Sequence, residues 1–136
     1  MATRNFSAVI EFPPSVNTYY RRAGHHIHMS KRGREFKKRT ADVARYKMNG
    51  EPPMTGRVSV GIALCAPNRR KYDIDNRVKA VLDALQGVVF EIDEQVDAIH
   101  VVRMPHDVTL GEGHACVAVA EAPEQKAPTK KVKKKT

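Results

Sequence analysis

Apolar and polar residues alternate along several stretches of the chain, and this period of two is typical of β-strands. Residues 6–12 place every second side chain on one apolar face, and the stretch ends at Pro13 and Pro14. Residues 58–64 alternate large apolar with small side chains, which indicates a strand in the middle of a sheet. Two further strands are expected at about 96–104 and 115–120.

The apolar period changes to that of a helix in two other stretches. Ser30 is placed to cap a helix that runs to about Met48, with a thin apolar stripe formed by Phe36, Val43 and Ala44. A second helix follows residue 73, and its core-facing stripe has helical spacing: Val78, Val81, Leu82 and Leu85. Gly87 suits the position just after the last turn of this helix.

The predicted order of elements is β-α-β-α-β-β. It favours an α+β domain, or an α/β two-layer domain, in which helices pack on a mixed β-sheet. We assign this domain to residues 1–120. Residues 15–29 show no clear period, so an ordered loop is expected there. Residues 121–136 hold six Lys and two Glu, cannot supply a core, and are expected to form a disordered tail.

The chain is basic, because 24 Lys and Arg residues against 15 Asp and Glu residues give a formal net charge of +9. This balance favours a polyanionic partner, of which nucleic acid is the commonest and a membrane surface the weaker alternative. No run approaches the ~20 apolar residues that span a bilayer, and no signal peptide is recognised, so we expect a cytoplasmic protein. Cys65 and Cys116 lie in apolar stretches and are expected to be buried free thiols.

Two aspartates, Asp73 and Asp75, open the second helix, and Lys79 follows one turn after Asp75. Carboxylates this close repel each other unless a cation or a group of donors lies between them. In the simpler interpretation, Asp75 caps the helix and forms a surface contact with Lys79. In the other, the aspartates bind a metal ion and the lysine stabilises charge on a phosphate.

Residues 80–102 contain no Lys or Arg, although the chain is basic. The acidic residues there are Asp83, Glu91, Asp93, Glu94 and Asp97. They either collect cations or are ordinary turn residues before the next strand, and this segment alone does not separate the two interpretations. If they collect cations, Asp93 joins Asp73 and Asp75 as ligands for Mg²⁺, which can polarise a phosphodiester and activate water.

Basic residues gather in two regions. Between residues 19 and 47 there are ten Lys or Arg residues and two acids. A solvated helix face explains part of that excess, and a surface that follows DNA phosphates explains all of it. Residues 68–72, Asn-Arg-Arg-Lys-Tyr, form a basic approach to Asp73. The cluster of His25, His26 and His28 lacks zinc-finger spacing, which favours a solvated or phosphate-contacting loop.

The run D-I-D-N-R-V-K-A-V-L-D-A-L at residues 73–85 is followed by I-D-E-Q-V at 92–96. Together they resemble the signature D-x-D-N-x-x-K-A-x-x-D-A-L … D-x-Q-V of the RusA family of Holliday junction resolvases. Residues 12–20, F-P-P-S-V-N-T-Y-Y, are similar to the P-P-S-x-N-x-x-Y segment of that family. The matches span about residues 6–120, in the order and at the spacing of the family.

The resemblance implies a homodimeric, Mg²⁺-dependent endonuclease, with Mn²⁺ as a substitute cation, that cuts four-way DNA junctions symmetrically in two strands during recombination and repair. The residues that match the family's catalytic acids and its motif lysine are Asp73, Asp75, Asp93 and Lys79. Ile92 stands where the family often has a further acid, so Asp93 is the expected ligand and Glu94 an outside candidate. Asn76 matches the asparagine of the signature and would orient the site.

DNA contacts are expected from polar and basic side chains near this site: Asn17, Arg21, Arg22, Arg69, Arg70, Lys71, Asn76 and Arg77. Two other functions stay open at this point. The chain could be a basic nucleic-acid-binding module without catalysis, in which the acids only cap and solvate. It could also be a metal-dependent nuclease without a preference for junctions. Metal-dependent, paired nicking of a four-way junction separates the three.

Overall fold

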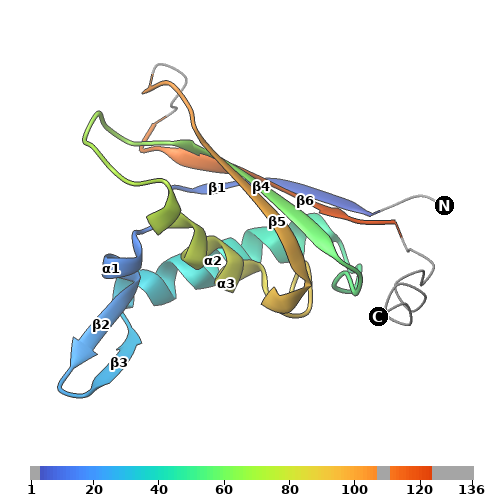
Figure 1. Cartoon of the computed structure of the whole chain (residues 1–136), viewed down its shortest axis with the longest axis horizontal. Helices are drawn as coiled ribbons and strands as arrows, with labels where there is room; N and C mark the ends of the chain where they lie inside the picture. Colours follow the sequence, from blue (N-terminus) through green and yellow to red (C-terminus); the bar gives the residue numbers. More distant parts are fainter. Residues whose placement is uncertain (1–3, 107–110, 124–136) are drawn as a thin grey trace, which may run out of the picture.

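Two helices cover one face of a four-stranded sheet in the computed structural model, which describes residues 4–106 and 111–123 (Figure 1). The helices are α2 (Lys31–Met48) and α3 (Val78–Leu85). The strands, in the order of the sheet, are β1 (Asn5–Glu11), β6 (His114–Glu121), β4 (Val58–Cys65) and β5 (Val96–Arg103). The predicted α+β class and the order of these main elements are confirmed, and β4 is an interior strand as expected.

The sheet is mixed, because β4 and β5 run parallel whereas β6 pairs antiparallel with β1 and β4. A parallel pair needs a crossover, and α3 supplies it with the short helices η1 (Asp75–Arg77) and η2 (Asp93–Gln95). The carboxyl ends of β4 and β5 therefore meet at one edge of the sheet, where Leu64 pairs with Arg103. The basic loop 66–72 leaves the sheet at this edge.

The core lies between the sheet and the helices. Every second residue of β4 is buried from Val58 to Leu64, as the alternating pattern predicts. On α3 the stripe was predicted in the right place, but Val78 and Leu82 are only partly buried. The fully buried positions of α3 are Ala80, Val81, Ala84 and Leu85. Small alanine side chains suit this face because α3 packs closely against α2.

Helix α2 begins as expected after Ser30, whose Oγ accepts a hydrogen bond from the backbone N–H of Gly33 at 3.0 Å. A glycine is required there, because a Cβ atom on Gly33 would come within 2.6 Å of the carbonyl oxygen of Tyr19. Val43, predicted to face the core, is instead 37% exposed. The buried side of the helix is the one that carries Phe36, and Val43 lies beyond its margin.

Residues 15–29, predicted as a loop, form regular structure instead. Helix α1 (Val16–Tyr19) leads into an antiparallel hairpin of β2 (Tyr20–Ala23) and β3 (His26–Met29). The hairpin projects from the body of the molecule (Figure 1). The loop prediction was wrong because most hairpin side chains meet solvent, so no apolar period marks the strands; even Ile27 is 61% exposed.

The folded part of the chain continues past residue 120. Glu121, assigned above to the tail, closes β6, and its carboxylate accepts a hydrogen bond from the backbone N–H of Gly56 at 2.9 Å. The predicted tail from residue 124 onward lies outside the described residues. Among the residues that are described, no helix is both long and apolar enough to cross a membrane.

The two cysteines differ in their surroundings. Cys65 is a buried free thiol, as expected, whereas Cys116 is an exposed one. Cys116 alternates with the buried residues Ala115 and Val117 on β6, so its side chain lies on the sheet face that the helices leave open. An apolar strand sequence predicted burial for both thiols but could not tell which face of the sheet would be covered.

Candidate active site

Asp73 and Asp75 lie at the turn that precedes α3, and both are exposed. Asp75 is the first residue of η1, but the N-cap position of η1 is Ile74 and that of α3 is Arg77, and neither makes a side-chain capping hydrogen bond. Asp75 therefore does not cap the helix. Within the described residues, neither carboxylate accepts a hydrogen bond or forms an ion pair. Both remain available to a ligand.

Lys79 is paired with Asp83 rather than with Asp75. Its Nζ lies 3.0 Å from Oδ1 of Asp83. The hydrogen bond with Asp83 raises the pKa of Lys79, and the negative charge of Asp93 adds to that rise. The Asp93 carboxylate, which comes from η2, is thus close enough to act on the ammonium group of α3. The surface contact between Asp75 and Lys79 is not formed.

Gln95 fixes the loop that carries Asp93. Its Oε1 accepts hydrogen bonds from the backbone N–H groups of Glu91 and Ile92, both at 2.8 Å. Its Nε2 donates to the carbonyl oxygens of Met54 and Gly56, both at 2.8 Å. The side chain is buried, so all four bonds are protected from water. The sequence interpretation had given Gln95 no role; its place in the x-Q-V motif was the only signal.

Asp93 is the first residue of η2, and its backbone N–H donates to Oε1 of Gln86 at 2.8 Å. Its Oδ1 is buried and makes no hydrogen bond within the described residues. A buried carboxylate oxygen without a donor is unfavourable unless a cation or water meets it. A bound cation or water would therefore contact this oxygen of Asp93.

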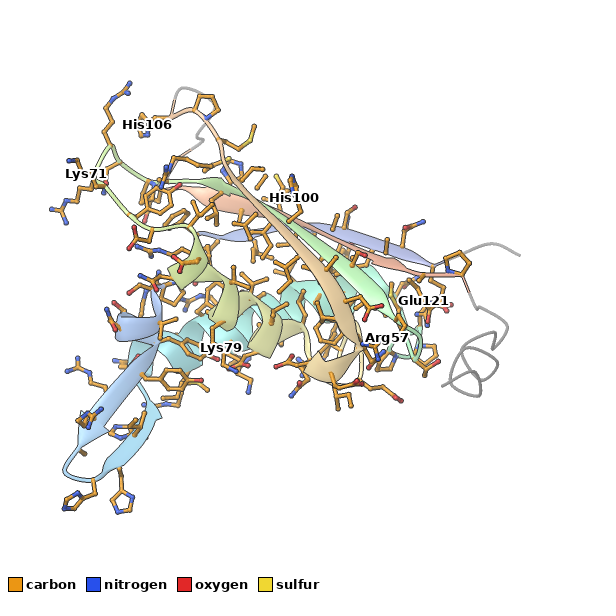
Figure 2. The ribbon with its side chains drawn as sticks, in the orientation of Figure 1. Arg57, Lys71, Lys79, His100, His106 and Glu121 are labelled. Carbon is orange, nitrogen blue, oxygen red and sulfur yellow. The ribbon has the colours of Figure 1, made fainter. Side chains whose placement is uncertain are left out.

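Glu94, the outside candidate, is engaged elsewhere. Its carboxylate lies 3.1 Å from Nη1 of Arg57, and the same guanidinium holds Asp97 at 2.6 Å. Figure 2 places Arg57 at the opposite end of the molecule from Lys71. Glu94 is therefore engaged in a structural ion pair, and Asp93 stays the expected ligand of the two neighbouring acids.

A concave surface that encloses a volume of about 520 Å³ includes Asp73 in its lining. It is lined by Ala66, Asn68, Arg69, Arg70, Lys71, Tyr72, Asp73, Arg103, Met104 and His106. Lys71 and His106 lie at the same end of the molecule (Figure 2). Sequence reasoning missed Arg103 and His106, because only the parallel pairing of β4 and β5 brings them beside the loop after β4. No local pattern in the chain could have identified them.

Arg77, expected to contact DNA, is held against the protein. Its Nη1 donates to the carbonyl oxygen of Pro13 at 2.9 Å. Its guanidinium lies over the rings of Phe12 and Tyr72, 5.1 and 5.5 Å from their centroids. Burial lowers the pKa of Arg77. This geometry is that of an anchor between the segment after β1 and the start of α3, and a DNA contact by Arg77 stays a prediction.

The other expected DNA-binding side chains lie on four separate segments. Arg69, Arg70 and Lys71 line the concave surface, whereas Arg21 and Arg22 are exposed on β2 of the hairpin. Asn17 is exposed on α1, which packs against η1 and α3, and Asn76 is partly buried in η1. Their contacts with DNA also stay predictions.

Side chains alone do not enclose a metal ion here. Among residues 4–106 and 111–123, no group of three His, Cys, Asp or Glu side chains is close enough to hold one. The chemistry of the predicted ligands nevertheless fits Mg²⁺, which takes oxygen donors and commonly uses one or two carboxylates with waters and substrate phosphates. Within the part of the chain that the structure describes, Asp73 and Asp75 offer carboxylates without partners, and Asp93 offers a buried oxygen that lacks a donor.

The sequence resembles proteins of known activity over most of its length. Residues 11–119 match the sequence model of the family described as Endodeoxyribonuclease RusA. A crossover junction endodeoxyribonuclease of Enterobacteria phage HK97 is 33% identical over 99 residues, which are 72% of this chain and 82% of that protein. The enzyme of the same name from Escherichia coli strain K12 is 35% identical over 107 residues, or 78% of this chain and 87% of that protein. That of Enterobacteria phage 82 is 34% identical over the same shares.

Proposed function

The chain belongs to the RusA family of endodeoxyribonucleases, and we propose that it resolves four-way DNA junctions by Mg²⁺-dependent hydrolysis of one phosphodiester in each of two strands. The observation that carries the proposal is the position of Asp73. Its carboxylate lines the same concave surface as Arg69, Arg70 and Lys71, yet it pairs with none of them. Because the Asp73 carboxylate is exposed and forms no ion pair with these three cationic side chains, it is available to bind a metal ion when DNA occupies this surface.

We assign the metal to Asp73, Asp75 and Asp93, whose carboxylates have to come closer together on binding than they lie in this structure. The buried oxygen of Asp93 supports this assignment, because it lacks any donor among the described residues. A bound Mg²⁺ would polarise the scissile phosphate and lower the pKa of its bound water. Mn²⁺ also prefers oxygen ligands and is expected to substitute.

The protein's own side chains position the DNA and stabilise charge. Water adds to the phosphorus, one P–O ester bond breaks, and the departing oxygen takes up a proton. Negative charge grows on the phosphate oxygens as the water adds, and we assign its stabilisation to the ammonium group of Lys79. Arg69, Arg70 and Lys71 contact flanking phosphates, and these contacts should make affinity depend on salt.

The hairpin supplies a second DNA contact. Arg21 and Arg22 are exposed on β2, and neither forms an ion pair within the described residues. The hairpin projects beyond the body of the protein (Figure 1), and its first strand follows directly after α1, which packs against α3. Backbone phosphates of an arm that leaves the cutting site are therefore within its reach. Asn17 and Asn76 contact the DNA closer to the acids.

The active form is a homodimer. A junction presents two equivalent strands to be cut, and a two-fold symmetric pair of subunits offers two identical sites at a fixed separation. One subunit alone would nick a single strand. The family resemblance supports this assembly, and the mass of the protein in solution tests it.

A labelled four-way junction tests the proposal. In Mg²⁺ we expect paired nicks that EDTA abolishes, and an excess of unlabelled linear duplex should compete poorly for the enzyme. A mobility shift without nicks in Mg²⁺ or Mn²⁺ would contradict catalysis. Nicking that linear duplex suppresses as well as unlabelled junction does would contradict the preference for branched DNA.

A further inference from the structure

Lys79 and Asp83 form an ion pair that is sheltered on one side. They lie one turn apart on α3, with Nζ 3.0 Å from Oδ1, and the Asp83 side chain is only 15% exposed. Helix α2 holds a pair of the same types at the same spacing, Lys38 with Asp42, at 2.9 Å. There the side chains are 77% and 52% exposed. Solvent and salt screen the α2 pair far more strongly, so the α3 pair constrains its lysine better.

The hydroxyl of Tyr19 lies near the same carboxylate and comes from another element. Tyr19 ends α1, its side chain is fully buried, and its O–H makes no hydrogen bond within the described residues. Burial raises the pKa of Tyr19, and the nearby negative charge of Asp83 raises it further. The hydroxyl therefore keeps its proton and can donate it only to an acceptor in its immediate surroundings, of which Asp83 is the charged one.

We propose that Asp83 is a positioning residue that holds the ammonium group of Lys79 in place before DNA binds, and that the hydroxyl of Tyr19 orients the Asp83 carboxylate. The inference rests on the proposed role of Lys79 at the scissile phosphate. A lysine side chain has many rotamers, and fixing it in advance removes an entropic cost from the chemical step. The arrangement also links two separate sequence motifs, because Tyr19 comes from the segment after β1 and Asp83 from α3.

Three variants test this inference: Asp83→Asn, Tyr19→Phe and, as a matched control, Asp42→Asn. The measurements are the single-turnover cleavage rate of a labelled four-way junction in Mg²⁺, the Kd for that junction in Ca²⁺, and the urea midpoint of unfolding. We expect D83N to slow cleavage by about 10- to 100-fold with little change in Kd. D42N removes a Lys–Asp pair of the same spacing and should leave the cleavage rate unchanged.

Tyr19→Phe isolates the hydroxyl. It removes a buried hydroxyl whose charged neighbour is Asp83 and keeps the ring and its packing, so the unfolding midpoint should change little, whereas cleavage should slow in the same direction as in D83N. In the double variant the loss should equal that of D83N alone, because Tyr19 acts through Asp83. Asp83→Glu retains a carboxylate at the same helix position and should recover part of the rate.

The outcomes separate this inference from the proposed function. If D83N and Y19F both cut at the parental rate while Lys79→Ala does not, the inference is wrong and the role of Lys79 stands. If K79A itself cuts at the parental rate, the proposed role of Lys79 fails first. If D83N lowers the urea midpoint, Y19F decides: slower cleavage with an unchanged midpoint supports the inference, and a parental rate overturns it.

Discussion

The guanidinium of Arg103 lies over the ring of Tyr72, 4.7 Å from its centroid, and donates a hydrogen bond to the carbonyl oxygen of Tyr72. The last residue of β5 thereby supports the loop that runs from β4 to Asp73. A planar guanidinium can stack on the ring and donate to the carbonyl at the same time, whereas an ammonium group cannot. The position of Asp73 thus depends on a strand that follows it in the chain.

Arg103→Lys should loosen this loop although it keeps the charge. We expect the free energy of unfolding to fall by about 1 kcal/mol, from the lost stacking and the weakened hydrogen bond. Urea unfolding measures the change. Arg70→Lys is the matched control, because Arg70 lines the same concave surface and its side chain makes no hydrogen bond within the described residues. Equal losses in the two variants would show that the contact with Tyr72 is not what supports the loop.

Gln95→Glu should destabilise the protein through two lost donors. The carboxylate would face the carbonyl oxygens of Met54 and Gly56, which would lose their hydrogen bonds, at a cost of roughly 2–4 kcal/mol. Those carbonyls would raise the folded-state pKa of the introduced carboxyl above its unfolded value. The loss should therefore shrink as pH falls and grow as pH rises towards neutrality.

Urea unfolding of Q95E at several pH values checks this expectation. Gln86→Glu is the control, because Oε1 of Gln86 only accepts a hydrogen bond, from the backbone N–H of Asp93, and a carboxylate can still accept it. A loss of stability in Q95E that does not vary with pH, or one matched by Q86E, would contradict the role given to the amide donor.

The two thiols should react at different rates in the native protein. Burial raises the pKa of Cys65, so its thiol stays protonated further above neutral pH and is also shielded, whereas Cys116 is exposed. We expect one thiol to react quickly with a disulfide reagent at pH 8 and the second only on unfolding. Cys116→Ser should abolish the fast reaction. Two fast-reacting thiols in the native protein would contradict the buried position of Cys65.

The elements that sequence reasoning located well are those whose side chains meet the core on one face. The alternation in β4 follows from the burial of one strand face in the core, and Ser30 caps α2 through a local hydrogen bond. These signals lie within a few neighbouring residues. The β2–β3 hairpin carries no such signal, since most of its side chains are solvated. It is defined by the antiparallel backbone pairing of its two strands, in which Tyr20 lies opposite Met29.

Parts of the candidate site could not be inferred because they depend on contacts between distant residues. Arg103 reaches the loop before Asp73 only after β4 and β5 pair in parallel. The anchoring of Arg77 beside Phe12 and Pro13 depends on the contact between the segment after β1 and η1, which no local pattern shows. The choice of Asp83 as the partner of Lys79, rather than Asp75, depends on the side-chain conformation.

Removal of residues 124–136 should weaken DNA binding without abolishing cleavage. This segment holds six Lys and one Glu, so its loss removes cations that can contact phosphates, while residues 11–119 contain the whole family match. We expect the slope of log K against log salt to become less steep, by as much as about 5. Titrations of a labelled junction at several salt concentrations measure it. An unchanged slope would show that the segment does not touch DNA.

The metal-ligand role of the aspartates is tested most directly by Asp75→Asn. The variant keeps the shape of the side chain but removes its negative charge, and Asp97→Asn serves as the control because Asp97 is paired with Arg57 and is not one of the assigned ligands. Junction Kd and the single-turnover cleavage rate in Mg²⁺ are measured for both. We predict that D75N binds the junction at least as tightly as the parent but cuts it about 100-fold more slowly or not at all, while D97N cuts normally. Cleavage by D75N at the parental rate in Mg²⁺ would contradict the metal-ligand assignment.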